Sequence, residues 1–403
     1  MKYIILICDG AADYPLKELG GKTILQAAKK PNMDSIAKNG CSGLLETVPK
    51  KYEPGSDVAN LSIMGYDPDT YFPGGRGVIE AASIGVDVGT NDLPMRANII
   101  TAKDGKIVDY SADGISNKEG KALIEAANRA FGDKHIKFYP GVSYRNLLVL
   151  KDVDIKPGEL KFDAPHDHPG KPVSAHLARG TTRNGREWAN KLNEIMLKSV
   201  DLFEKHSVND ARRAQGRPLA NMLWFWGPGK KKCDFPTIKE RYGLKGSVIT
   251  AIDLIRGIGI LAGLKVKNVD GATAYFDTNY EGKADAAAEA LNSGDDIVVI
   301  HVEAPDEAGH GGLIDEKIRA VENIDKRLLG RLMGKIRGEY RIGILPDHYT
   351  PISAKTHVHG AVPFAIMGPG IQRDSVERFD EESAKKGGFG LRGGPEFIGL
   401  LVK

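Results

Sequence analysis

The stretch YIILICDG, residues 3–10, decides the fold class of this chain. Six consecutive apolar or aromatic residues lead directly into Asp9 and Gly10. An unbroken run of this kind is typical of a strand buried on both faces, as in a parallel sheet covered by helices. The run is too short for a signal peptide or a membrane span, so we expect neither. The stretch predicts an α/β fold with a carboxylate at the end of a buried strand.

Three further apolar runs have the same character. They are DIVVIHVEAP (296–305), RIGILP (341–346) and VPFAIMG (362–368). Helical stretches separate such runs, among them DAAAEALNSG (285–294) and EKIRAVENIDKRLLGRLMGKI (316–336). Asp306 follows the first run and Asp347 the second, as Asp9 follows the N-terminal one. Open α/β sheets bind their ligands at the carboxyl ends of the strands. We therefore expect a mostly parallel sheet flanked by helices, with these three carboxylates at its ligand-binding edge.

The middle of the chain has a different pattern. RANIITAKDGKIVDYSA (96–112) contains two β-like runs around Asp104 and Gly105, which is a hairpin signal. EWANKLNEIMLKSVDLFEKH (187–206) has the apolar spacing of an amphipathic helix. We predict that residues 71–240 form an α+β domain inserted into a discontinuous α/β core made of residues 1–70 and 241–403.

Composition narrows the class of protein. A chain of 403 residues with 41% hydrophobic and 27% charged residues is expected to form two globular domains with ample cores. The net charge of +3 gives no sign of a nucleic-acid or membrane partner. Cys8, Cys41 and Cys233 show no CxxC spacing, which favours a reduced, cytoplasmic setting. The oligomeric state stays open.

Histidines are concentrated in one window, since five of the ten lie between His301 and His359. Asp306 and His310 are four residues apart, so on a helix both can face one point. Asp347 and His348 are adjacent, so on an extended segment they would point in opposite directions and could serve two separate centres.

Together with Asp9, this window offers three carboxylates and at least three imidazoles. Such a set is too polar to bury without metal or mutual pairing. Separate surface or paired residues are the alternative interpretation. Mixed aspartate and histidine ligands without a thiolate point to Mn²⁺ or Zn²⁺, and six ligands suit a site with two metals roughly 3.5–4 Å apart.

Ser56 stands in EPGSDVANLSIMGYDPDT, residues 53–70, at the start of a helix-like run. One interpretation is a helix cap, with Gly65 ending the helix. The other is a nucleophile. No histidine or lysine lies near Ser56 in the sequence to act as its base, but a divalent cation lowers the pKa of a hydroxyl group without one. The helix start beside it favours an incoming anion such as phosphate.

The chain resembles the cofactor-independent phosphoglycerate mutases of the archaeal type, within the alkaline-phosphatase-like metalloenzymes. The similarity covers nearly the whole length. It is carried by ICDGAAD (7–13), KTILQAAKKPNMDSIAKNG (22–40), PGSDVANLSIMGYDP (54–68), GGRGVIEAASIGVDV (74–88), DTNYEGKADAAAEAL (277–291), DEAGHGG (306–312) and PDHYTPISAKTHVHGAVPF (346–364). The resemblance implies an alkaline-phosphatase-like core with an inserted substrate-binding and phosphotransfer domain.

The resemblance also implies roles for single residues. Ser56 is the residue phosphorylated in the catalytic cycle. Two divalent ions are expected, Mn²⁺ first and Zn²⁺, Co²⁺ or Mg²⁺ as alternatives. One ion would be held by Asp306, His310 and His357, and the other by Asp9, Ser56, Asp347 and His348. His357 is preferred to His359 because family members keep the ligand five residues before the valine of VPF.

The implied reaction interconverts 3-phosphoglycerate and 2-phosphoglycerate through phosphoserine. An inserted domain that closes over the core would keep water from hydrolysing that intermediate. Arginines are the expected clamps on phosphate and carboxylate, and the candidates are Arg96, Arg145 and Arg256, with Arg76 a weaker fourth.

One segment departs from the family pattern. Where these mutases often carry an arginine in a glycine-rich turn, this chain reads ANMLWFWGPG, residues 220–229, with Trp224 and Trp226. The alternative function is therefore a related phosphotransferase with another acceptor, such as a homoserine kinase. A third hypothesis is a silent metal-binding or regulatory protein, and the intact serine and ligand set argue against it.

Overall fold

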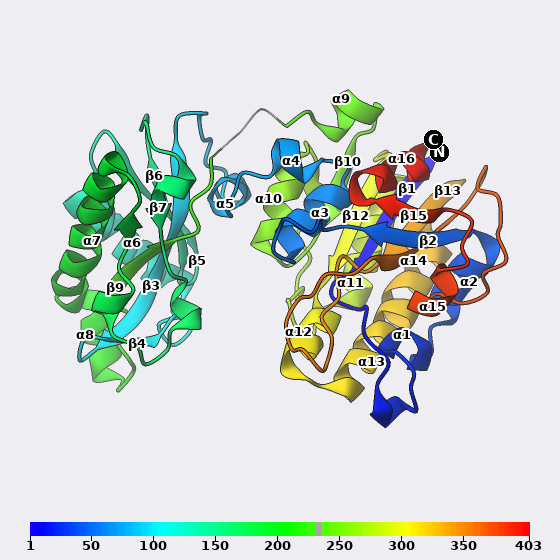
Figure 1. Cartoon of the computed structure of the whole chain (residues 1–403), viewed down its shortest axis with the longest axis horizontal. Helices are drawn as coiled ribbons and strands as arrows, with labels where there is room; N and C mark the ends of the chain where they lie inside the picture. Colours follow the sequence, from blue (N-terminus) through cyan, green and yellow to red (C-terminus); the bar gives the residue numbers. More distant parts are fainter. Residues whose placement is uncertain (231–234) are drawn as a thin grey trace. The chain divides into compact units, whose positions relative to one another are not determined.

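The structure is a computed structural model that describes residues 1–230 and 235–403, so Cys233 lies outside the described residues. The chain divides into two compact units (Figure 1). The core unit consists of Met1–Tyr71 and Phe235–Lys403, and the insert consists of Phe72–Asp234. No helix in the described part of the chain is long and apolar enough to cross a membrane.

The core unit contains an eight-stranded sheet whose central strand is β1. In spatial order the strands are β11 (Lys265–Val266), β10 (Gly246–Ile249), β12 (Ile297–Val302), β1 (Lys2–Cys8), β13 (Tyr340–Leu345), β14 (Val362–Met367), β2 (Cys41–Glu46) and β15 (Gly390–Gly393). β1 pairs in parallel with β12 on one side and β13 on the other. Their carboxyl ends therefore meet at one edge, and the α/β fold predicted from the sequence is confirmed.

β14 runs against the predicted direction. The run VPFAIMG was expected to be one more parallel strand, but β14 is antiparallel to both β13 and β2. A continuous apolar run reports burial on both faces and carries no information on strand direction. The sheet is therefore mostly parallel, with one antiparallel strand among its members.

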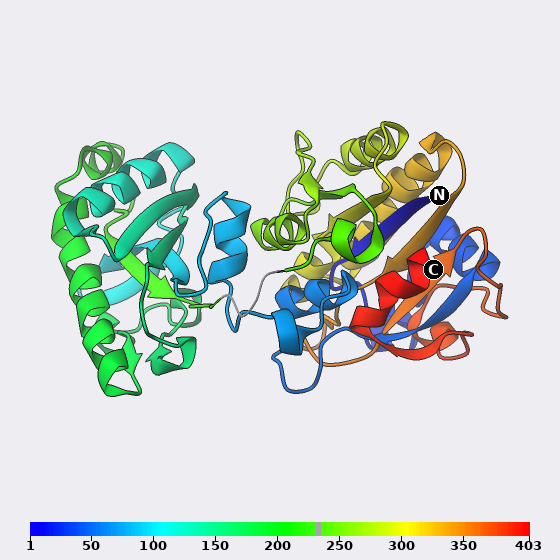
Figure 2. The same ribbon diagram turned by 90° about the horizontal axis from the view of Figure 1, so that it is seen from above.

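Helices cover both faces of this sheet. Ile4 and Leu6 of β1 pack into a core cluster with α2, α11, α13 and α14, whereas Ile5 and Ile7 alternate to the other face. On that other face, Phe397 of α16 contacts Phe364 of β14 edge to face. Figure 2 shows the dark-blue β1 between the yellow-to-orange helices and the red α16.

The helices of the core unit are mostly short. They are α1 (Ile24–Ala27), α2 (Pro31–Asn39), α3 (Ser56–Ile63), α4 (Pro68–Tyr71), α9 (Ile238–Tyr242), α10 (Asp253–Leu261), α11 (Tyr280–Asn292), α12 (Ala304–Gly311), α13 (Ile314–Asn323), α14 (Gly330–Lys335), α15 (Glu381–Ala384) and α16 (Phe397–Val402), with 3-10 turns η1 (Lys17–Leu19) and η6 (Gly394–Glu396) and a π-helical turn η5 (Ile324–Leu329).

The insert has its own antiparallel sheet. Its strands are β3 (Leu93–Lys103), β4 (Lys106–Asp109), β5 (Ile136–Val142), β6 (Arg145–Leu150) and β9 (Met222–Trp226), and a separate pair is formed by β7 (Leu160–Lys161) and β8 (Arg179–Gly180). β3 and β4 form the hairpin expected around Asp104 and Gly105, both of which have positive φ angles of 50° and 69°. Two consecutive residues of this conformation match the twist of a two-residue hairpin turn.

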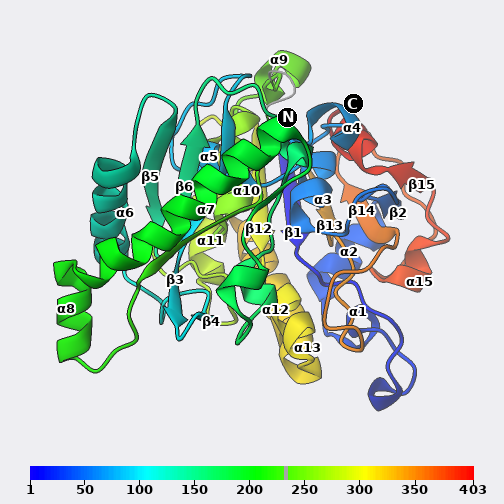
Figure 3. The same cartoon turned by 60° about the vertical axis from the view of Figure 1, so that its left-hand side comes forward.

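Helices pack on both faces of the insert's sheet as well. Leu148 and Leu150 of β6 belong to a cluster with α6 and α7, while the alternate residues Leu147 and Val149 contact Ala81 of α5 on the opposite face. Figure 3 shows α6 and α7 together beside the sheet strands. The insert's helices are α5 (Gly77–Ser83), α6 (Asn117–Phe131), α7 (Arg183–Glu204) and α8 (Ser207–Ala214), with 3-10 turns η2 (Pro157–Glu159), η3 (Pro165–Asp167) and η4 (Val173–Ala175).

Candidate active site

The carboxyl ends of the central strands place the predicted polar residues at one edge of the core sheet. Asp9 directly follows β1, and Asp306 lies on α12 just after β12. Asp347 and His348 follow β13. Gly10 has a φ of 60°, and a Cβ atom there would collide with the Asp306 carboxylate and the Thr350 hydroxyl. Glycine at this position allows the backbone after β1 to approach α12 closely.

Asp306, His310 and His357 form a first group of metal-type ligands. The Nε2 atom of His310 lies 3.2 Å from one Asp306 oxygen, and that of His357 lies 3.4 Å from the other. The two Nε2 atoms are 3.0 Å apart. All three side chains thus direct ligand atoms at one point, and the four-residue spacing of Asp306 and His310 on α12 aligns them as the sequence indicated.

Neighbouring groups orient this first group. The Lys355 carbonyl lies 3.0 Å from His310 Nδ1, so Nδ1–H donates to it and Nε2 is the nitrogen directed at Asp306 and His357. The Thr350 hydroxyl donates to the Asp306 carboxylate. The hydrogen bond to Asp306 raises the pKa of His310 to about 9 in the absence of metal.

Asp9, Asp347 and His348 form a second group, and all three side chains are buried. His348 Nε2 lies 3.4 Å from an Asp9 oxygen and 3.6 Å from an Asp347 oxygen. One Asp347 oxygen accepts hydrogen bonds from the backbone N–H groups of Gly10 and His348, at 3.1 and 3.0 Å. The carboxylate of Asp347 is therefore fixed by backbone donors.

Asp347 and His348 both belong to this second group, so they do not form the two separate centres that an extended segment would allow. The segment after β13 is bent at these two residues and is not an extended strand. The alternation of side chains that an extended segment imposes therefore does not apply.

Ser56 faces the second group. Its Oγ atom lies 3.1 Å from His348 Nε2. Ser56 is the first residue of α3, and the preceding Gly55 is the N-cap and makes no side-chain cap. The interpretation of Ser56 as the cap is therefore wrong, whereas Gly65 does end the helix, since it follows the C-cap Met64 with a φ of 89°. The histidine that the local sequence lacks is supplied by a segment 292 residues away.

The geometry suits divalent cations at both groups. Asp9 Oδ1 is buried and has no hydrogen-bond partner among the residues that the structure describes. Burial, together with the charges of Asp347 and Asp306, raises the pKa of Asp9 well above its ordinary value. The Nε2 atoms of His310 and His357, 3.0 Å apart, are two further ligand atoms that face one point. A divalent cation would neutralise the buried carboxylates and bind the converging imidazole nitrogens. Carboxylate oxygens and imidazole nitrogens are suitable ligands for such an ion.

Several polar residues around the site were not singled out from the sequence. Asn60 donates to the second Asp347 oxygen at 2.8 Å and to the Ser56 carbonyl at 2.9 Å. His301, on β12, lies 3.2 Å from Asp9. Lys283 donates to the His301 carbonyl, and burial lowers its pKa to about 8. Asn60 could have been found, since it stands four residues after Ser56 on one helix face.

The candidate arginines fall in different units. Arg96 on β3 pairs with Glu80, and its guanidinium lies over the Trp226 ring at 4.7 Å from the centroid. Arg145 begins β6, and its guanidinium lies 5.4 Å from the Tyr144 ring centroid.

Arg256 lies on α10 of the core unit and donates to Asn268. The weaker candidate Arg76 directly precedes α5 of the insert. His359 is exposed and belongs to none of the groups of possible metal ligands found among the described residues.

Comparisons with known proteins identify the family. A family model described as 2,3-bisphosphoglycerate-independent phosphoglycerate mutase matches residues 37–209. The mutase of that name from Methanosarcina barkeri is 47% identical over 407 residues, with 100% of each chain covered. The chain belongs to the 2,3-bisphosphoglycerate-independent phosphoglycerate mutases. The family's member from Methanothrix thermoacetophila is 48% identical over 405 residues, again with 100% of each chain covered.

A solved structure of the same family agrees in fold. The cofactor-independent phosphoglycerate mutase from Thermoplasma acidophilum superimposes with a TM-score of 0.66 at 27% identity, covering 100% of this chain and 99% of that one. The resemblance inferred from the sequence motifs is thereby confirmed. The relatives are named as mutases, which gives no support to the homoserine-kinase alternative raised by Trp224 and Trp226.

Proposed function

We propose that this chain interconverts 3-phosphoglycerate and 2-phosphoglycerate through a phosphoserine formed at Ser56. The observation that carries the proposal is the position of Ser56 Oγ, 3.1 Å from His348 Nε2 at the edge of a buried cluster of carboxylates and imidazoles. The family membership of the chain favours the same reaction. A cytoplasmic location stays a prediction from the sequence.

Two divalent ions, Mn²⁺ in our proposal, would be held by Asp306, His310 and His357 and by Asp9, Asp347 and His348 with Ser56. They would supply positive charge that favours an ionised serine and neutralises the phosphoryl oxygens. Asn60 and the backbone N–H of Gly10 hold the Asp347 carboxylate in place. In the first group, Thr350 holds the Asp306 carboxylate and the Lys355 carbonyl holds the His310 ring.

In the proposed reaction, Ser56 Oγ attacks phosphorus and the bond between phosphorus and the 3-oxygen of the substrate breaks. Ser56 is the first residue of α3, and the N-terminus of a helix would favour the negative phosphoryl oxygens. The 2-hydroxyl of the resulting glycerate then attacks the phosphoserine and regenerates Ser56. Substrate binding by the insert, with Arg96 and Arg145, and by Arg256 of the core unit is part of the proposal.

The test is a phosphorus NMR assay with the purified full chain. With Mn²⁺ and 3-phosphoglycerate alone, we expect 2-phosphoglycerate to appear without inorganic phosphate. Exhaustive chelation should abolish this conversion, and Asp306→Ala should lower both bound metal and turnover, whereas Asp201→Ala on the exposed surface of α7 should change neither. Full turnover in chelated protein, or transfer only to added homoserine, would refute the proposal.

A further inference from the structure

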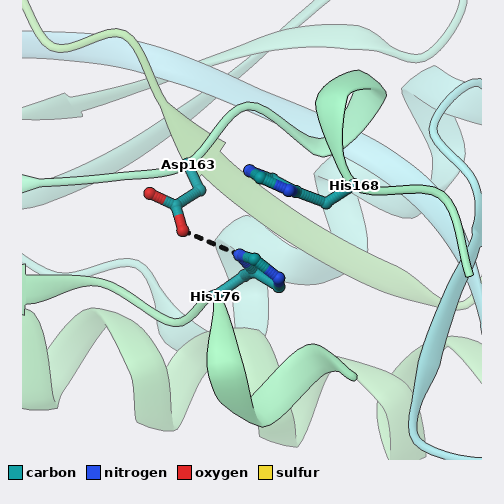
Figure 4. A group of neighbouring side chains, drawn as sticks. All are labelled: Asp163, His168 and His176. Atoms are coloured by element: carbon teal, nitrogen blue, oxygen red, sulfur yellow. Dashed lines mark hydrogen bonds and ion pairs between the residues drawn. The ribbon is translucent and has the colours of Figure 1, made fainter. Parts of the chain in front are cut away.

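A third group of metal-type ligands is formed entirely by residues of the insert. Asp163, His168 and His176 offer one ligand atom each, and these atoms all lie within 4.8 Å of one another. Figure 4 shows the three side chains converging. We call them the insert cluster. All three residues are partly buried, so their side chains are constrained by neighbours and still reachable from solvent.

The backbone of the insert cluster is held in place before any ligand binds. Asp163 follows β7, and its carbonyl accepts a hydrogen bond from the Trp224 indole at 2.8 Å. His168 and His176 each end a 3-10 turn, and each backbone N–H donates back into that turn, at 3.3 and 3.1 Å. Pre-positioned ligands lose less conformational entropy on binding an ion.

The side chains of the insert cluster share one orientation. The imidazole rings of His168 and His176 are stacked, with centroids 3.9 Å apart and an angle of 20° between their planes. Figure 4 shows a nitrogen of each ring on the side that faces the Asp163 carboxylate. The lone pair of an imidazole nitrogen lies in the plane of its ring, so one of these stacked rings must turn about its side-chain torsions for both to bind the same ion.

The Asp163 carboxylate has one oxygen directed to the two rings. Its Oδ2 accepts a hydrogen bond from His176 Nδ1 at 2.8 Å, and Oδ1 is bound by Arg179 at the same distance. These partners lower the pKa of Asp163, although its partial burial opposes the shift. The carboxylate is thus ionised and firmly placed.

Solvent has access to the insert cluster through a cavity. Asp163 and His168 line a hollow of about 600 Å³ within the insert, together with Arg179 and Trp226. The hollow provides an entry path to the side chains of Asp163 and His168. A three-ligand site with one open position is a common arrangement for zinc.

We propose that Asp163, His168 and His176 bind one divalent transition-metal ion of the Zn²⁺ class, at a site formed within the insert and distinct from the two metal groups of the core unit. The ion takes the place of the proton between His176 Nδ1 and Asp163 Oδ2. In the neutral ring that proton moves to Nε2 when the ion binds Nδ1. Two imidazoles and one carboxylate suit Zn²⁺, Co²⁺ or Ni²⁺ better than Mg²⁺ or Ca²⁺, which prefer all-oxygen sites.

A bound metal ion would cross-link the two ends of the segment that connects β7 to β8. Asp163 stands at the start and His176 near the end of the segment between β7 and β8, which are themselves paired only at Leu160 with Gly180 and Lys161 with Arg179. An ion held by this segment cross-links it, as structural metals do in small domains. We therefore expect bound metal to raise the thermal stability of the insert.

The experiment is equilibrium dialysis of the full chain against Zn²⁺, followed by elemental analysis. We expect wild-type protein to bind one equivalent more than His168→Gln or His176→Gln. His135→Gln removes an imidazole of the insert outside the cluster and should bind as wild type does. Asp306→Ala, which alters the core unit only, should keep the insert equivalent.

Crystals soaked in Zn²⁺ provide the second measurement. Anomalous density between Asp163, His168 and His176 would support the site directly, and far-ultraviolet circular dichroism checks that each variant is folded. Equal Zn²⁺ content in wild type and folded His168→Gln, or crystals without anomalous density at the cluster, would overturn the proposal. Neither result depends on turnover, so the proposed mutase reaction is tested separately.

Discussion

At the scale of single residues, the site depends on side chains that are close in space and distant in sequence. Ser56 faces His348, and Asp9 stands beside both Asp347 and His348. Each of these carboxylates would be costly to bury alone, since an unpaired buried charge costs several kcal/mol. Their convergence is therefore evidence for a ligand of opposite charge, which is the reason we assign cations to both groups.

Ser56→Ala tests the nucleophile at this scale. We expect phosphoryl transfer to fall by more than about 10⁴-fold, since loss of a nucleophile removes the covalent route. Stability should change by less than about 1 kcal/mol, because Ser56 makes no cap. Peptide mass spectrometry of trapped wild-type protein should find phosphate on Ser56. Near wild-type turnover in the variant would show that another group accepts the phosphate.

At the scale of elements, a buried ion pair fastens the loops that carry the site. Lys317 of α13 and Asp13, in the segment after β1, are both fully buried. The Lys317 ammonium donates to an Asp13 oxygen and to the Thr350 carbonyl, both at 2.7 Å. The Asp13 carboxylate in turn accepts from the backbone N–H of Ile352. Three segments near the metal ligands thus meet at one ammonium group.

Asp13→Ala should destabilise the protein by about 3–5 kcal/mol, because it leaves the Lys317 charge buried without a counter-ion. The matched control is Glu316→Ala, which breaks an ion pair with Arg319 on the exposed face of the same helix. That change should cost less than about 1 kcal/mol. Urea denaturation measures both. Equal effects of the two substitutions on the free energy of unfolding would mean that the buried ion pair does not stabilise the loops around the site.

At the scale of the whole molecule, two independently packed cores account for the stability of the chain. The insert buries its own cluster between its sheet and α6 and α7, and the core unit buries another around β1. Each unit contains enough apolar side chains in one cluster to resemble a separate domain. Their stabilities can therefore be examined one at a time.

The insert expressed alone, as residues 72–234, should fold cooperatively. Its cluster of buried side chains comes only from Leu93 to Phe225, so no core residue is lost by excision. A single cooperative thermal transition and dispersed amide resonances in a proton NMR spectrum would show this. A fragment with helix content but no cooperative transition would instead show that packing in the insert requires the rest of the chain.

The pH dependence of stability gives a second test at this scale. Burial raises the pKa of Glu381 to about 6, against the opposing hydrogen bonds from Thr23 and Asp13. The folded state therefore holds a proton that the unfolded state releases near pH 4.5. This contribution to stability is fully present below pH 4.5 and is lost as pH rises through about 6.

Glu381→Gln removes this titration. The free energy of unfolding of wild type, measured relative to the variant in urea, should therefore decrease by about 2 kcal/mol between pH 4.5 and pH 7. Measuring the difference between two proteins cancels the other groups that titrate in this range. A difference that is constant with pH would show that Glu381 is ionised in the folded protein throughout.

The sequence by itself determined the layout of the core. Three apolar runs, each followed by an aspartate, predicted buried strands whose carboxyl ends lie at one edge of a sheet. The aspartates are Asp9, Asp306 and Asp347, and the strands β1, β12 and β13 have that arrangement. Strand burial and periodicity are local properties, so a single sequence records them. The motifs also indicated the family, which the relatives confirm.

The tertiary structure alone decided the rest. The antiparallel direction of β14, the pairing of Ser56 with His348 and the support of Asp347 by Asn60 are all set by contacts across long sequence separations. The bend that brings Asp347 and His348 into one group has no signal in their spacing. Local patterns report what each segment buries, whereas the partner of a buried polar group is fixed only when the packed core leaves it a single place to lie.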